Sequence, residues 1–166
     1  MIRDRCAILI AGLISLVGCG GYHKYYFPID LSKKESGSVV VRILKPGNYS
    51  IALGFLRNHR RDDFHAENFF NDSIWRGAGG GRPTKIWIRL SCDGRVVFDK
   101  IAYSTGVDGI IPVYQGEEIV SATLRDIGSI AIDRGECIVE FSNLMTDDDL
   151  GKIDSGLILY FYEPKV

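Results

Sequence analysis

Hydrophobic and polar residues alternate along several short stretches of the chain, which is the pattern of half-buried β-strands. In 49–55 the large side chains fall on alternate positions. Asp93-Gly94 lies between two further stretches, 86–90 and 96–98, and this dipeptide strongly indicates a β-hairpin. The remaining predicted strands are 39–44, 130–132, 137–141 and the nearly continuous apolar run 157–162, which is typical of a sheet interior.

One segment has a helical period instead. Its apolar and small side chains recur at the spacing of one helix face, at Ala66, Phe69, Phe70, Ser73 and Ile74. We therefore predict one helix over about 62–76, followed by a glycine-rich connector at 77–81. Residues 118–127 fit either a helix or a strand, and the pattern does not decide between them.

Several strands at short spacing, separated by turn signals such as 45–48 and 133–136, predict a mainly β chain. The expected architecture is an antiparallel β-sandwich, or a jelly-roll-like fold, with the helix inserted between strands. The helix would cover one end or one edge of the sandwich.

The N-terminal residues follow a different pattern. A short basic leader precedes an apolar stretch at 7–17, which has no polar face and is too short to span a bilayer. The stretch ends in Leu-Val-Gly-Cys at 16–19, which resembles the lipobox of bacterial lipoprotein signal peptides. The resemblance implies cleavage between Gly18 and Cys19 and a diacylglycerol on Cys19. The alternative is an ordinary buried helix at the start of a cytosolic domain, which would normally show a polar face.

This interpretation divides the chain into three parts. Residues 1–18 are a cleaved signal peptide, 19–26 a lipidated tether, and 27–166 a single β-sandwich domain. Gly20, and not an aspartate, follows the lipidated cysteine, which in Gram-negative lipoproteins implies export to the outer membrane. We therefore expect a protein anchored by lipid in the bacterial cell envelope and facing the periplasm.

Charge and cysteine content narrow the possible partners. The chain has 20 Lys and Arg against 21 Asp and Glu, a net charge of −1, with no basic stripe that would favour nucleic acid. Cys6 leaves with the signal peptide and Cys19 carries the lipid. Cys92 and Cys137 remain, and an oxidising envelope permits them to pair. Two separate buried thiols are the alternative.

Three stretches are similar to a family of uncharacterised bacterial β-sandwich lipoproteins: FPIDLSK at 27–33, KPGNYSIALGF at 45–55 and IGSIAIDRGECIVEF at 127–141. In that family, too, a charged helix and a glycine-rich loop separate the first strand pair from the central hairpin. Where the family has Pro-Gly-x-Tyr, this chain has Arg-Gly-Glu-Cys at 134–137, which favours a structural role for Cys137. The resemblance implies the fold and brings no catalytic residues.

Few residues suggest catalysis or metal binding. His59 and His65 share a charged segment with Asp62 and Asp63, but their spacing matches no metal motif and the neighbouring arginines oppose cation binding. The chain has no Gly-x-Ser-x-Gly elbow, no Lys-Ser/Thr after its glycine-rich loop, and no EF-hand spacing around the aspartates at 147–149. We therefore expect no enzyme activity, no metal and no cofactor.

Aromatic and charged residues are the best candidates for a binding surface. Trp87 alternates with apolar strand neighbours and is expected in the core. The loop 104–116 is long enough to bind a partner. The candidate surface consists of Arg57, His59, Arg60, Trp75, Tyr103 and Tyr114. We expect a non-catalytic protein-binding module, as an accessory or immunity lipoprotein. The alternative is a glycan-binding module for cell wall or lipopolysaccharide.

Overall fold

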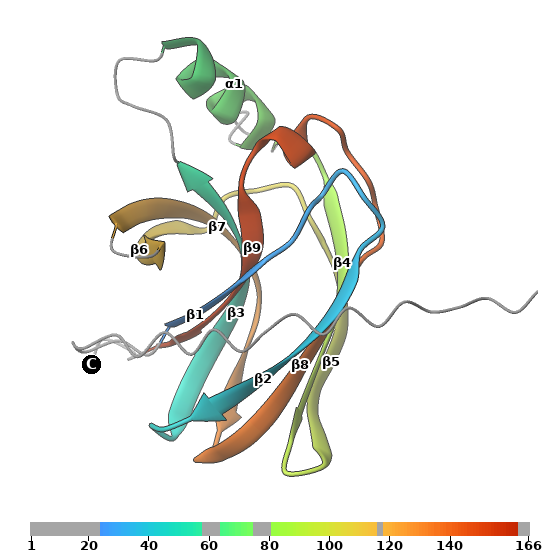
Figure 1. Ribbon diagram of the computed structural model, residues 1–166, viewed down its shortest axis with the longest axis vertical. Helices are drawn as coiled ribbons and strands as arrows, with labels where there is room; N and C mark the ends of the chain where they lie inside the picture. Colours follow the sequence, from blue (N-terminus) through green and yellow to red (C-terminus); the bar gives the residue numbers. More distant parts are fainter. Residues whose placement is uncertain (1–23, 58–63, 75–80, 116–117, 163–166) are drawn as a thin grey trace, which may run out of the picture.

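The computed structural model describes residues 24–57, 64–74, 81–115 and 118–162, and forms two facing antiparallel sheets with one helix over an end (Figure 1). The protein is a β-sandwich with an inserted helix, so the fold predicted from the sequence pattern is confirmed. Sheet A has five strands, in the order β1 (Lys24–Pro28), β9 (Ser155–Phe161), β3 (Gly47–Arg57), β7 (Glu118–Ile132) and β6 (Gly109–Gln115). Sheet B has four strands, in the order β2 (Ser36–Ile43), β8 (Gly135–Asn143), β4 (Thr84–Cys92) and β5 (Arg95–Ser104).

Most predicted strands lie where the alternation places them, and three differences stand out. The ambiguous segment 118–127 is the first part of β7. Lys24–Tyr26, predicted to be tether, belong to β1 and pair with β9. Most of the predicted binding loop is strand β6. This strand lies at the edge of sheet A, where a proline such as Pro112 is tolerated.

The hairpin signal at Asp93-Gly94 is confirmed. Both residues have positive φ, 49° and 76°, as a tight two-residue hairpin turn requires. The turn joins β4 to β5, and β4 pairs with β8 on its other side.

The main hydrophobic core fills the space between the two sheets. Tyr49, Ile51, Leu53 and Phe55 alternate along β3 and are all buried. From sheet B they meet the inward-facing residues of β4, which are Ile86, Ile88 and Leu90.

Sheet A also buries part of its outer face. A second hydrophobic cluster lies there, formed by Ala52, Leu56, Val113, Ala122, Leu124 and Ile158. The sheet curls toward this face, so that its two edge strands meet: Lys24 Nζ on β1 donates a hydrogen bond to the Pro112 carbonyl on β6, at 2.7 Å. The curl converts an outer face into a small second core.

Helix α1 (Phe64–Ile74) lies over one end of the sandwich (Figure 1). Phe70, Ser73 and Ile74 are buried, as the helical period predicts. The helix is held by Arg125, a fully buried guanidinium that donates to the carbonyls of Ile74 and Arg82, at 3.2 and 2.6 Å. Burial lowers the pKa of Arg125 to about 10. No helix among the described residues is long and apolar enough to cross a membrane.

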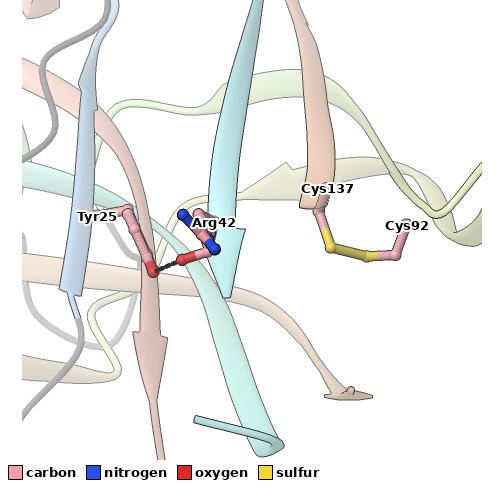
Figure 2. Close-up of a disulfide and its surroundings, with 4 residues drawn as sticks. All are labelled: Tyr25, Arg42, Cys92 and Cys137. Carbon is pink, nitrogen blue, oxygen red and sulfur yellow. Dashed lines mark hydrogen bonds between the residues drawn. A yellow bond between two sulfur atoms is a disulfide. The ribbon is translucent and has the colours of Figure 1, made fainter. Parts of the chain in front are cut away.

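Two side-chain links reinforce the frame (Figure 2). Cys92 on β4 and Cys137 on β8 are directly opposite each other, with Cα atoms 4.1 Å apart, and form a disulfide. The structure thus pairs the two thiols that the sequence left open. The Tyr25 hydroxyl on β1 donates to the Arg42 carbonyl on β2, at 2.5 Å, which ties an edge of sheet A to an edge of sheet B.

Candidate functional site

The residues predicted to form one binding surface do not come together. His59, Arg60 and Trp75 lie outside the described residues, as do Gly18 and Cys19 at the proposed cleavage site. Arg57 serves the fold: its guanidinium contacts Asn71 at 3.2 Å and Glu67 at 3.7 Å, and so attaches β3 to α1.

Tyr103 and Tyr114 are both exposed, by 64% and 51%, but they belong to different sheets. Tyr103 lies on β5 of sheet B and Tyr114 on β6 of sheet A. The two tyrosines of the predicted surface therefore do not lie together, because β6 pairs with β7 and carries Tyr114 away from sheet B.

Sheet B has an apolar outer face, which we call the sheet B face. Strand pairing aligns Val40, Ile138, Ser91 and Val96 in one row across the sheet, and its three apolar members have exposed fractions between 41% and 49%. A second row has its apolar residues on β4 and β5, where Trp87 lies opposite Ile101, and Ile101 is 57% exposed. On β8 and β2 the same row continues as Ser142 and Ser36. The rows lie four residues apart along the strands, or roughly 13 Å.

A charged row lies between these two apolar rows. It consists of Glu140, Arg89 and Asp99, on three neighbouring strands. Arg89 Nε is 3.9 Å from a carboxylate oxygen of Asp99, and the Trp87 indole donates to the other oxygen at 2.9 Å. The row therefore has two carboxylates against one guanidinium.

The expectation that Trp87 lies in the core is wrong. Its neighbours Ile86 and Ile88 point inward, so the alternation of the strand turns Trp87 outward. An apolar residue on each side of a tryptophan does not reveal which of the two faces the sheet buries. The indole bond to Asp99 keeps the ring on the sheet B face.

A polar cleft of about 330 Å³ lies on the outer face of sheet A, beside the second cluster. Strand pairing aligns Ser50 with Tyr160 on β9 and with Ser129 on β7. The cleft is lined by Ser50, Asp126, Gly128, Ser129, Tyr160 and Tyr162.

Asp126 and Tyr160 form the centre of this cleft. The Tyr160 hydroxyl donates a hydrogen bond to Asp126 Oδ1, at 3.4 Å, and Ser50 lies opposite Tyr160 on the neighbouring strand. Burial and the nearby Asp108 carboxylate raise the pKa of Asp126, whereas burial and Asp126 raise the pKa of Tyr160. The cleft thus offers one carboxylate and several hydroxyl groups, and the residues lining it include no basic side chain.

The three aspartates at 147–149 form a structural turn. Asp147 Oδ1 accepts hydrogen bonds from the backbone amides of Asp149 and Leu150, which begins the short 3₁₀-helix η2 (Leu150–Lys152). Arg82 forms ion pairs with Asp147 and Asp149. Within the described part of the chain, no group of three or more His, Cys, Asp or Glu side chains is placed to hold a metal ion.

Sequence reasoning missed the cleft entirely. Its serines and tyrosines belong to strands that read as apolar, and only the register of β3 against β7 and β9 brings them together. The sequence contains one signal for Asp126, since only Asp126 and its neighbour Arg125 carry a charge in the stretch 119–132. It lies where the register of β7 against β3 shifts, and such irregularities are common beside functional sites.

Comparisons with known proteins support the fold. No family model and no curated protein matches the chain. Among solved structures, a crystal structure of a protein from Sulfurospirillum deleyianum is similar, with a TM-score of 0.60 and 15% sequence identity over 85% of this chain and 98% of that chain. At this identity the likeness shows the fold alone, and the resemblance to the lipoprotein family stays a prediction.

Proposed function

We propose that this chain is a lipid-anchored protein of the bacterial cell envelope that binds a second protein through the sheet B face. The observation that carries the proposal is the alignment of exposed apolar side chains into two rows across that sheet. A face that combines exposed apolar side chains with polar and charged ones resembles the mixed surface of non-obligate protein interfaces. The proposed activity is binding, without catalysis.

The charged row defines the partner's chemistry. Glu140 and Asp99 together carry one more charge than Arg89 neutralises, so a partner that presents apolar side chains to the two rows should place a basic side chain between them. Electrostatic complementarity of this kind fixes register and excludes competing partners.

Two observations support the envelope location. The apolar stretch at 7–17 ends in the lipobox-like motif before Cys19. Cys92 and Cys137 are paired, and disulfides persist in the oxidising compartments outside the cytosol.

Replacing Cys19 by serine should abolish acylation and leave an uncleaved precursor. Normal processing and membrane fractionation of that variant would contradict the proposed anchor.

The partner experiment uses two isoleucines of the sheet B face. Tagged full-length protein, crosslinked in cells and purified, should carry one protein in a constant ratio. Ile101→Glu and Ile138→Glu should remove that protein, because each places a charge in an apolar row. Thr146→Glu is the control, since Thr146 is exposed in the segment that follows β8 and belongs to neither row. Retention of every bound protein by both sheet B variants, with the disulfide intact, would overturn the proposal.

The cleft on sheet A favours a second candidate function, the binding of a neutral saccharide. Its volume of about 330 Å³ is at the lower end for small-ligand sites. Carboxylate and hydroxyl groups complement the hydroxyls of a sugar ring, and two tyrosine rings add apolar surface. The carboxylate of Asp126 would repel a phosphate or an acidic sugar, so cell-wall and lipopolysaccharide sugars without charge fit best.

Saturation-transfer NMR with glucose, galactose, mannose and N-acetylglucosamine tests this second candidate. Full-length protein in a sugar-free detergent should bind at least one of them, and Asp126→Asn should weaken binding about tenfold, the equivalent of one charge-assisted hydrogen bond. Asp133→Asn, in the exposed turn after β7, is the charge-matched control. Binding that is unchanged in Asp126→Asn, or absent for every sugar, would reject the cleft as a saccharide site.

A further inference from the structure

The hairpin of β6 and β7 is apolar on both faces. Ile111, Val113 and Val120 point toward the second hydrophobic cluster. On the opposite face, Tyr114 pairs directly with Ile119, and Ile110 lies four residues before Tyr114 along β6. The exposed fractions of these three side chains are 52% for Ile110, 51% for Tyr114 and 62% for Ile119. We call Ile110, Tyr114 and Ile119 the hairpin face.

The hairpin lies beside the start of the described chain. Lys24 is the first residue of β1, and its ammonium contacts the Pro112 carbonyl in the middle of β6, at 2.7 Å. Lys24 follows Cys19 by only five residues. Even when fully extended, a segment of that length spans no more than about 18 Å.

The short connection from Cys19 and the contact between Lys24 and Pro112 limit how far the hairpin can lie from a lipid on Cys19. If Cys19 carries the lipid, the short connection holds β1, and with it β6, close to the bilayer surface. Tyrosine side chains favour the boundary between headgroups and acyl chains, and isoleucine side chains bury their apolar surface there. Sheet B lies on the other side of the molecule, and its apolar face would point away from the bilayer (Figure 1).

We propose that the hairpin face is a second membrane contact, which binds the lipid surface and fixes the orientation of the sandwich on it. This inference rests on the lipid anchor of the proposed function. It assigns Ile110, Tyr114 and Ile119 to the bilayer and leaves the sheet B face free for a protein partner. A short anchor alone would leave the domain free to rotate about its attachment point.

The test places a photoreactive benzoylphenylalanine at position 119 and, as the matched control, at position 101. Ile119 and Ile101 are the same residue type and are 62% and 57% exposed. Each full-length acylated protein is reconstituted into vesicles of phosphatidylethanolamine and phosphatidylglycerol and illuminated, and phospholipid adducts are measured by mass spectrometry. We expect several-fold more lipid adduct from position 119 than from position 101.

The outcomes separate this inference from the proposed function. Equal lipid labelling from the two positions, or no lipid adduct at 119 in protein that is acylated and sediments with the vesicles, would overturn the membrane contact and leave the anchor intact. Protein that is processed normally and never acylated would overturn both. As a second measurement, a glycine-serine insertion after Gly21 should reduce labelling from position 119, because a longer connection weakens the constraint on the hairpin.

Discussion

The two sheets of this sandwich treat their outer faces differently, although both faces are partly apolar. Sheet A curls, joins its edge strands through Lys24 and Pro112, and buries residues such as Leu56 and Ile158 in a second cluster. Sheet B is held by a disulfide between its two central strands and leaves Val40, Val96 and other apolar residues exposed. The difference shows that apolar residues outside the main core can be buried against one another in one sheet and remain exposed in the other.

The disulfide gives the largest expected effect on sheet B. A double variant, Cys92→Ala with Cys137→Ala, should unfold with a free energy about 4 kcal/mol lower, as expected for a cross-link over 45 residues. Urea unfolding of the oxidised protein and of the variant measures this difference. A reducing agent should lower the stability of the wild type and leave the variant unchanged. Equal unfolding midpoints would contradict a stabilising role.

Two isoleucines test the contrast between the outer faces directly. Ile158 is fully buried in the second cluster, whereas Ile138 is 41% exposed on the sheet B face. Ile158→Ala should cost about 3 kcal/mol through lost burial and a cavity. Ile138→Ala should change the unfolding free energy by less than about 0.5 kcal/mol. Similar losses in thermal unfolding for the two variants would mean that sheet B relies on its outer face as much as sheet A does.

The contact between the edge strands of sheet A should have a smaller effect. Lys24→Met removes the hydrogen bond to the Pro112 carbonyl and should cost about 1 kcal/mol. The loss should be local, so amide hydrogen exchange should quicken in β6 and not in β5, the edge of sheet B. Uniform exchange throughout both sheets would contradict the idea that this bond maintains the curl.

The smallest effect concerns the turn that connects sheet B to sheet A. Hydrogen bonding from Lys152, together with the charge of Arg82, lowers the pKa of Asp149. Because folding lowers this pKa, the ionised carboxylate of Asp149 stabilises the folded protein at pH values above the ordinary pKa of aspartate. This stabilisation is lost as the pH falls through the lowered pKa. NMR titration should find the pKa of Asp149 higher in Arg82→Gln than in the wild type. An unchanged value would mean that Arg82 contributes nothing to it.

The alternation of apolar and polar residues predicted those strands that bury one face and expose the other. The segment Tyr49–Phe55 and the hairpin around Asp93-Gly94 are confirmed because local alternation and turn chemistry determine them. Strand β1 was missed because it has only five residues, and β6 was missed because its sequence contains a proline and a glycine. Edge strands tolerate Pro112 and the glycine at position 109, which read as loop signals.

The candidate sites were largely beyond sequence reasoning for a related reason. Strand alternation indicates two faces but not which of them the sandwich buries, so Trp87 was assigned to the core. The cleft depends on long-range register, which aligns Ser50 with Ser129 and Tyr160. Arg57 was a reasonable surface candidate by composition, but its contacts with α1 use it for packing.

The position of the last strand has a consequence for how the chain reaches its native state. β9 pairs with β1 on one side and with β3 on the other, so sheet A has a gap until the C-terminal residues are present. Contacts between the first and last strands close the longest loops in the domain, and such non-local pairing slows folding. The chain should therefore complete its sheets during synthesis only after Ser155–Phe161 emerge.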